Sequence, residues 1–297
     1  MKLKIEGIFP PIATPFADGR VAHDRLRENL ERWNKTRLAG YAVFGSNGES
    51  VFLDQEEKLA LVDTVKENLP QDKLLIAGTG CESTEATVKL TNLAAERGAD
   101  AALVVTPHYY KGNMDNAALR KHYLRIADES DVPILIYNVP KFTGISVVPE
   151  LVASLAEHSN IIGIKDSSGN IAQVGEMIAT TPPPPTFHVL AGSAGHLLAA
   201  LGLGASGGIL ALANVAPDEC CKIFEDFRSG RYAEARELQL KLLAANKAVT
   251  AQFGVSGLKA ALDMVGYFGG DPRSPLLPLG ENQRNELREI LKGAGLI

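Results

Sequence analysis

Eight short apolar segments recur at fairly even intervals along the chain. They are residues 7–13, 40–44, 73–78, 101–106, 132–137, 161–165, 187–191 and 208–211. Each is apolar almost throughout and does not alternate between apolar and polar side chains, which is typical of strands covered on both faces. This repetition constrains the possible folds more than any other feature of the sequence, because eight buried strands must find partners in a common sheet.

The segments between these strands have the periodicity of amphipathic helices. In residues 55–69 the apolar side chains recur on one helical face, with Asp54 as N-cap and Glu57 placed to complete a capping box. Residues 83–97 repeat the plan, and Gly98 follows as a helix-ending glycine. Strands that alternate with helices predict a parallel sheet. Eight such units predict a closed (β/α)8 TIM barrel in preference to an open doubly wound sheet.

The C-terminal part of the chain exceeds what a barrel of ~250 residues requires. The eighth barrel helix is expected at about residues 216–228. Three further helical segments follow at 232–249, 257–265 and 281–292. We therefore expect residues 1–228 to form the barrel. Residues 229–297 should form a C-terminal three-helix extension that packs on it within a single structural unit.

Composition and charge exclude several classes of partner. The 297 residues carry a formal net charge of −5 and contain no basic run, so we expect neither nucleic acid nor a membrane surface as a partner. The charged N-terminal residues predict no signal peptide, and no apolar stretch approaches the ~18 residues of a membrane span. Three cysteines, two of them adjacent, predict no disulfide framework. A cytoplasmic location is expected.

Lys165 carries the strongest chemical signal in the sequence. It ends an apolar segment, and a polar turn follows it. Because burial disfavours the charged form of a lysine, an amine in such a position can act as a nucleophile and form a Schiff base with a ketone. Tyr137 ends the preceding strand, so a parallel sheet would bring amine and phenol to the same end. The simpler alternative is a strand-end lysine that extends to water.

Residues 45–49, Gly-Ser-Asn-Gly-Glu, follow the second strand, at the end of the barrel where active sites lie. Gly45 and Gly48 allow backbone N–H groups to line a concave turn, and Ser46 and Asn47 add side-chain donors. Such a nest can bind a small carboxylate. The alternative is an ordinary strand-to-helix turn.

The sequence lacks the patterns expected of a metal site or a dinucleotide-binding site. The six histidines show no metal-ligand spacing and no carboxylates cluster at the strand ends, so we expect no metal. Residues 202–207 match G-x-G-x-x-G but precede a strand, whereas a dinucleotide-binding loop follows one. His108 lies at a strand end, where it is either catalytic or simply polar surface.

These motifs, in this order, resemble the dihydrodipicolinate synthase / N-acetylneuraminate lyase family of class I, pyruvate-dependent aldolases. The resemblance covers nearly the whole chain and depends most on residues 45–49, 137–140 and 163–166. It implies that Lys165 is the Schiff-base lysine and that the enzyme needs no cofactor. It also implies that Tyr137 moves protons with the help of the Ser46 hydroxyl.

The resemblance further implies the surroundings of the substrate. The turn containing Ser46, Asn47 and Gly48 would hold the pyruvate carboxylate. Tyr109 or Tyr110 would reach into the site of a neighbouring subunit in a homotetramer built as a dimer of dimers. The remaining residues expected to contact substrate are Ser167, Gly192, Ser193, Ile209 and Phe142.

Phe142 bears on the second substrate. Lysine-biosynthetic members of the family usually have an arginine there, which binds the carboxylate of aspartate semialdehyde. An aromatic ring cannot replace that clamp, and Lys141 offers only a point charge displaced by one residue. Residues 77–84, 191–195 and 211–215 are closer to the 4-hydroxy-2-oxoglutarate aldolase branch.

We therefore expect a lyase that cleaves a 4-hydroxy-2-oxo acid, either 4-hydroxy-2-oxoglutarate or a 2-keto-3-deoxy sugar acid, to pyruvate and an aldehyde. One alternative is 4-hydroxy-tetrahydrodipicolinate synthase, which condenses pyruvate with aspartate semialdehyde. The other is a non-catalytic, pyruvate-binding regulatory barrel. The three classes differ in whether an imine forms with pyruvate and in which aldehyde reacts.

Overall fold

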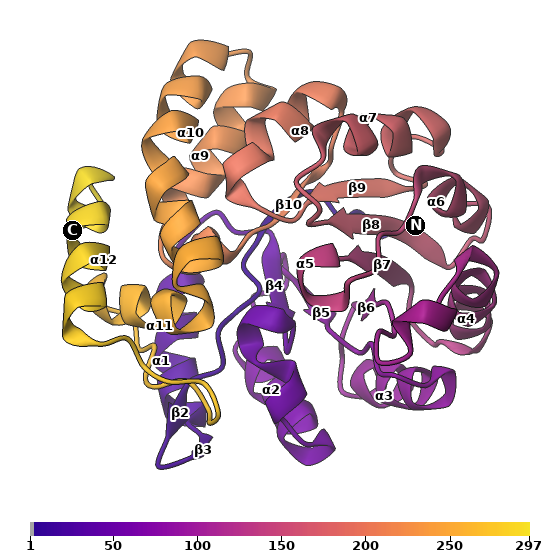
Figure 1. The fold of residues 1–297 in the computed structure, drawn as a ribbon, viewed down its shortest axis with the longest axis horizontal. Coiled ribbons are helices and arrows are strands. Elements are labelled where there is room, and N and C mark those ends of the chain that lie inside the picture. The colour runs from indigo at the N-terminus through magenta and orange to yellow at the C-terminus, as the bar shows by residue number, and fades with distance from the viewer. Residues whose placement is uncertain (1–2) are drawn as a thin grey trace.

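A computed structural model describes residues 3–297. Eight parallel strands form the inner layer of the molecule and helices surround them (Figure 1). The strands are β1 Gly7–Phe9, β4 Gly40–Val43, β5 Leu74–Ala77, β6 Ala101–Val105, β7 Ile134–Asn138, β8 Ile161–Asp166, β9 His188–Ala191 and β10 Gly207–Ile209. Each overlaps one of the eight predicted segments.

The sheet closes into a barrel because its two end strands, β1 and β4, are also hydrogen-bonded to each other. Its order is β1-β10-β9-β8-β7-β6-β5-β4. The Ala39 N–H donates to the Ile8 carbonyl, and the Ile12 N–H donates to the Ala42 carbonyl, both at 2.9 Å. These bonds join β1 to β4, so the predicted TIM barrel is confirmed.

The barrel helices are α1 His23–Trp33, α2 Gln55–Glu67, α3 Thr84–Glu96, α4 Asn116–Glu129, α6 Pro149–Leu155, α7 Ile171–Thr180, α8 Leu197–Leu203 and α9 Pro217–Arg228. The three whose limits were predicted, α2, α3 and α9, begin and end within two residues of those limits. The capping box of α2 is present: the Glu57 N–H donates to the Asp54 carboxylate at 2.8 Å, and the Asp54 N–H donates to the Glu57 carboxylate at 3.1 Å. The small elements that were not predicted include the β2–β3 hairpin (Phe16–Ala17 with Arg20–Val21) and the short helix α5 (Pro140–Thr143).

Three more helices follow α9: α10 Tyr232–Lys247, α11 Gly254–Met264 and α12 Glu281–Gly293. A π-helical turn, Ala248–Gln252, continues α10 toward α11. The three helices lie along one side of the barrel, where α10 packs on α9 (Figure 1). The C-terminal helices are thus present, while the division of the chain after residue 228 stays a prediction.

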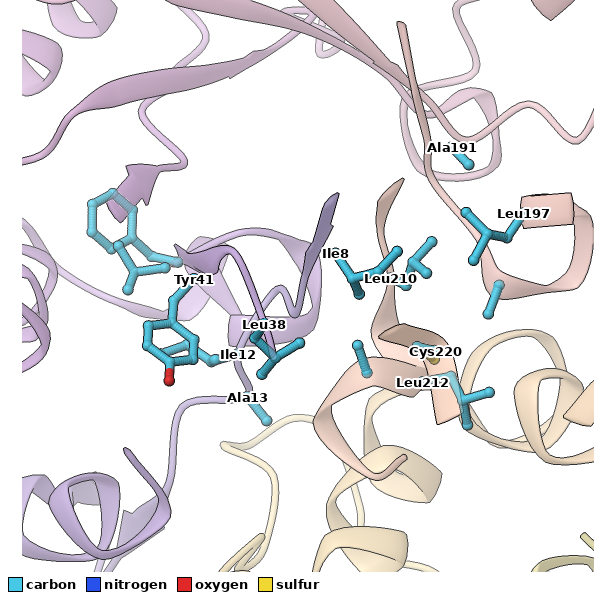
Figure 2. Packing of buried hydrophobic residues seen from close by; sticks show 14 of the residues in the cluster. Ile8, Ile12, Ala13, Leu38, Tyr41, Ala191, Leu197, Leu210, Leu212 and Cys220 are labelled. Atoms are coloured by element: carbon cyan, nitrogen blue, oxygen red, sulfur yellow. The ribbon is translucent and has the colours of Figure 1, made fainter. Parts of the chain in front are cut away.

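The core has an inner and an outer shell because each strand buries both faces. Phe9, Leu103, Leu190 and Ile209 point into the barrel. The side chains between the sheet and the helices form the larger cluster, and Figure 2 shows part of it. Ile8, which precedes the inward-pointing Phe9, belongs to this outer shell. This alternation explains why the strands read as continuously apolar in the sequence.

The structure shows no disulfide, no metal-binding cluster and no membrane-spanning helix among residues 3–297. Cys81, Cys220 and Cys221 are free thiols. Within residues 3–297, no group of three or more His, Cys, Asp or Glu side chains is arranged to hold a metal ion. No helix in the described part of the chain has the length and apolar character needed to cross a bilayer.

Candidate active site

Lys165 and Tyr137 lie side by side at the C-terminal mouth of the barrel. The parallel register of β7 and β8 pairs the two residues directly. The side chains are enclosed, with Lys165 only 3% exposed and Tyr137 6% exposed. The Lys165 Nζ lies 4.1 Å from the centre of the Tyr137 ring. Lys165 therefore does not extend to water, and its amine lies against a phenol in a mostly dry space.

The Tyr137 hydroxyl faces polar groups from two other strand ends. Burial acts to raise the pKa of Tyr137, but the Lys165 charge and the hydrogen bond with Ser46 outweigh it, so the pKa is lowered from its ordinary value. The hydroxyl lies 3.5 Å from the Ser46 Oγ. A phenol that releases its proton more readily is better suited to act alternately as acid and base.

The turn after β4 brings Ser46 to Tyr137. Ser46, Asn47 and Gly48 form a 3₁₀ turn in which the Gly48 N–H donates to the Gly45 carbonyl at 3.0 Å. The Thr14 hydroxyl donates to the Gly48 carbonyl at 2.7 Å. A Cβ at Gly48 would lie 3.0 Å from the Ile12 carbonyl oxygen, so a side chain there would push the turn away.

Gly45, Ser46 and Tyr137 line one small pocket at the mouth, together with Gly80 and Val105. The structure therefore brings the Ser46 hydroxyl and the phenol into one space. Asn47 lies next to Ser46 on the same turn and is half-buried. The phenol that lies against the Lys165 amine therefore also lines this pocket.

Ser167 follows Lys165 by two residues, and Gly192 lies against it. The buried Ser167 Oγ has no partner at hydrogen-bonding distance. A Cβ at Gly192 would lie 1.9 Å from that Oγ, so the glycine leaves the space that Ser167 occupies. The unpaired hydroxyl beside Lys165 is free to bond to a ligand.

Two other residues were predicted to contact the substrate, Ile209 and Ser193. Ile209 lies deeper in the barrel, and the Ser193 hydroxyl already has hydrogen-bond partners. Ile209, at the end of β10, is fully buried among the inward-pointing apolar side chains. The Ser193 Oγ accepts hydrogen bonds from the Gly195 N–H and the Asn246 amide, both at 3.2 Å. Ser193 therefore supports the local backbone, and Ile209 forms part of the apolar floor.

Three predicted site residues are not brought to Lys165. Tyr109 and Tyr110 are 77% and 71% exposed, with their rings edge-to-face at 5.0 Å. Phe142, on α5, is 59% exposed. Within one chain, these aromatic side chains lie on the surface and not in the pocket around Tyr137.

Sequence reasoning missed the contact made by Glu49, the residue that directly follows the turn of Ser46, Asn47 and Gly48. Its carboxylate is 2% exposed and lies 2.7 Å from the Nζ of Lys259, a residue of α11. The only signal in the sequence was a glutamate that directly follows Gly48, and nothing in the sequence pointed to its partner.

Comparison with known proteins agrees with this architecture. Residues 4–294 match the model of the dihydrodipicolinate synthetase family. The 4-hydroxy-tetrahydrodipicolinate synthase of Methanothrix thermoacetophila is 38% identical over 286 residues, which is 96% of this chain and 95% of the relative. The enzyme of the same name from Thermodesulfovibrio yellowstonii is 36% identical and covers 98% of this chain and 99% of its own length.

Solved structures give the same result. A monomeric dihydrodipicolinate synthase variant superposes with a TM-score of 0.93 at 32% identity, covering 99% of this chain and 98% of its own. YagE of E. coli K12, a prophage protein of the dihydrodipicolinic acid synthase family solved in complex with pyruvate, has a TM-score of 0.93 at 30% identity and covers 99% of both chains.

These relatives correct the prediction of 4-hydroxy-2-oxo acid cleavage, which is wrong. Full-length relatives at 36–38% identity are named 4-hydroxy-tetrahydrodipicolinate synthase, which was the alternative to cleavage. The preference for cleavage depended on Phe142 in the place of the carboxylate-binding arginine, because a buried carboxylate without a partner is costly. Phe142 is more than half exposed, so a carboxylate beside it would keep water as a partner and the penalty does not apply.

Proposed function

Because the chain belongs to the dihydrodipicolinate synthetase family, we propose that it condenses pyruvate with aspartate semialdehyde to 4-hydroxy-tetrahydrodipicolinate. Enzymes of this family are pyruvate-dependent lyases and synthases, and this chain is an enzyme of that kind. The observation that carries the proposal is the buried amine of Lys165 against Tyr137, whose hydroxyl lies 3.5 Å from Ser46.

The reaction begins at Lys165. Its ammonium gives up a proton, and the neutral amine attacks the C2 ketone of pyruvate. The same proton then leaves with the C2 hydroxyl as water, and a protonated imine forms. The imine withdraws electrons from the neighbouring methyl carbon, which loses a proton and becomes a nucleophilic enamine. This carbon attacks the aldehyde carbon of the semialdehyde. The protonated imine is itself the electron sink, so the scheme needs no cofactor.

Tyr137 completes the proton transfers. Its oxygen takes up the proton that leaves the methyl carbon and gives it to the alkoxide formed at the aldehyde carbon, with the Ser46 hydroxyl as relay. The amino group of the semialdehyde then attacks C2 and displaces the Lys165 amine, which closes the ring. One water is lost overall. The lowered pKa of Tyr137 supports this alternation between acid and base.

The turn after β4, Ser167 and Ile209 hold the bound keto acid. The turn that contains Ser46, Asn47 and Gly48 offers N–H and side-chain donors to the pyruvate carboxylate. The unpaired Ser167 hydroxyl bonds to a polar atom of the intermediate, and Gly192 leaves room for it. Ile209 packs below the methyl group.

A comparison of substrates on one enzyme preparation tests the proposal. We expect kcat/KM for pyruvate with aspartate semialdehyde to be at least about tenfold higher than for cleavage of 4-hydroxy-2-oxoglutarate. That ratio corresponds to about 1.4 kcal/mol in transition-state stabilisation. Product is followed by mass spectrometry and pyruvate release by a coupled assay. If an imine forms with pyruvate but no condensation follows, Lys165 still acts as the nucleophile, but aspartate semialdehyde is not the second substrate.

We also propose a homotetramer in which the Tyr109–Tyr110 loop packs against a neighbouring subunit. Two exposed aromatic rings on one loop are an unusual surface for a monomer and suit an interface. Sedimentation velocity at assay concentration should give four times 31.7 kDa, about 127 kDa. Replacing both tyrosines with alanine should shift the protein to smaller species and lower its activity. Full activity in a sedimenting monomer would contradict this assembly.

A further inference from the structure

A glutamate and a lysine far apart in the chain are buried against each other beside the anion-binding turn. Glu49 directly follows this turn, and Lys259 lies on α11, 210 residues later. Lys259 is 0% exposed and Glu49 2% exposed. Their Nζ and Oε1 atoms are 2.7 Å apart. The C-terminal helices therefore place a full charge next to the turn that ends at Gly48.

Both charged groups have additional partners from the C-terminal segment. The second carboxylate oxygen of Glu49 accepts the backbone N–H of Arg273 at 2.8 Å. The Lys259 ammonium also donates to the Asp271 carbonyl at 2.9 Å. The Lys259 Nζ lies 4.3 Å, and the Arg273 guanidinium 4.4 Å, from the centre of the Phe16 ring. Glu49 is thus held through both oxygens by residues of one late segment of the chain.

Stability alone does not account for this arrangement. Burial lowers the pKa of Lys259 from its ordinary value, although the Glu49 charge opposes the shift, so the ammonium is held at a desolvation cost. Apolar residues of similar volume often replace a buried ion pair with no loss of stability. Apolar side chains cannot, however, form the directional hydrogen bonds that hold the Glu49 carboxylate, and with it the Glu49 backbone, in one place.

The anchored position is the one that defines the end of the turn. Glu49 has φ +57°, the left-handed region that a residue with a Cβ seldom adopts. Such a conformation persists where the surroundings hold it. The Glu49 N–H donates to the Ser46 carbonyl at 3.3 Å, so the backbone of Glu49 and the start of the turn are directly linked.

We propose that Glu49 and Lys259 are positioning residues for the pyruvate half of the site. They hold Ser46, Asn47 and Gly48 in the shape that binds the carboxylate and keep the Ser46 hydroxyl within reach of Tyr137. Neither residue touches the substrate. This inference rests on the proposed function, since it concerns the binding of the keto acid.

The test measures the pyruvate KM in variants that remove the anchor. Lys259→Met and Glu49→Gln each leave one charged partner. The double variant Glu49→Met/Lys259→Met removes both charges, and so avoids a lone buried charge if a single variant fails to fold. We expect the pyruvate KM to rise by about 10- to 100-fold, the range for a small misplacement of a positioning group. The semialdehyde KM should stay unchanged, and borohydride trapping at saturating pyruvate should persist.

Lys73→Met is the matched control. Lys73 is also a buried lysine, and its ammonium donates to the Thr36 and Leu38 carbonyls. It directly precedes β5, at the end of the barrel opposite the mouth. This variant can lower the melting temperature, but the pyruvate KM should be unchanged because no site residue depends on it.

The possible results separate this inference from the proposed function. If the double variant folds and its pyruvate KM equals that of the unmutated protein, the pair is purely structural and the inference is overturned. If the unmutated protein forms no imine with pyruvate, the proposed function fails first. A raised pyruvate KM in the double variant, with Lys73→Met unchanged, supports the positioning role, because lost stability alone moves the melting temperature and not the KM.

Discussion

Lys165→Ala should abolish covalent capture of pyruvate and lower kcat by about 10⁴- to 10⁶-fold, the range seen when a nucleophile or its partner is removed from other enzymes. The physical reason is that Lys165 is the enclosed amine paired with Tyr137 across β7 and β8. Without it no imine forms and no electron sink exists. The measurement combines steady-state kinetics with borohydride reduction in the presence of pyruvate.

Mass spectrometry makes the Lys165 prediction specific. In the unmutated protein one peptide, containing residues 161–169, should gain the mass of a reduced pyruvyl group. In Lys165→Ala no peptide should gain it, whereas Lys73→Ala should label like the unmutated protein. Circular dichroism checks that the fold is retained. Labelling at a different lysine, in a folded Lys165→Ala protein, would remove Lys165 from the nucleophile role.

Tyr137→Phe should lower kcat by roughly 10²- to 10⁴-fold, the usual contribution of a positioned proton donor or acceptor. The substitution deletes one hydroxyl and almost no volume, so the packing inside the barrel is kept. Because the amine of Lys165 remains, trapping with pyruvate should still be measurable, though slower. Stopped-time trapping and steady-state turnover, measured on the same preparation, separate the two steps.

Tyr123→Phe is a matched control for Tyr137→Phe. Tyr123 is fully buried on α4, and its hydroxyl donates to the Val104 carbonyl at 3.0 Å. Its loss should cost stability on the order of 1 kcal/mol, because one buried hydrogen bond disappears, and should leave kcat unaltered. If the two phenylalanine variants turned over equally fast, Tyr137 would have no place in the proton transfers.

Local patterns in the sequence were sufficient for the fold and for the central pair of residues. Continuous apolar segments separated by amphipathic helices leave few arrangements other than a barrel covered on both sides. The capping box at Asp54 and Glu57 depends only on residues three positions apart, so its prediction is confirmed. Lys165 and Tyr137 end consecutive strands, and parallel pairing of consecutive strands brings such ends together.

The choice of second substrate could not be predicted in the same way. It depended on Phe142, whose effect on a nearby carboxylate differs between a buried and an exposed position. A single residue on a short helix belongs to no periodic pattern, so the sequence does not predict its exposure. The full-length relatives overturned the predicted cleavage reaction, and the 59% exposure of Phe142 explains why its chemistry was a poor guide.

The sequence by itself therefore determined the strand repeat, the capped helices and the presence of an amine and a phenol at one end of the barrel. Only the tertiary structure joined β1 to β4 and placed Lys259 of α11 against Glu49. It also left Tyr109 and Tyr110 on the surface of the chain. The physical reason is range: periodicity and capping act over a few residues, whereas closure, buried charge pairs and exposure depend on how segments up to about 200 residues apart pack together.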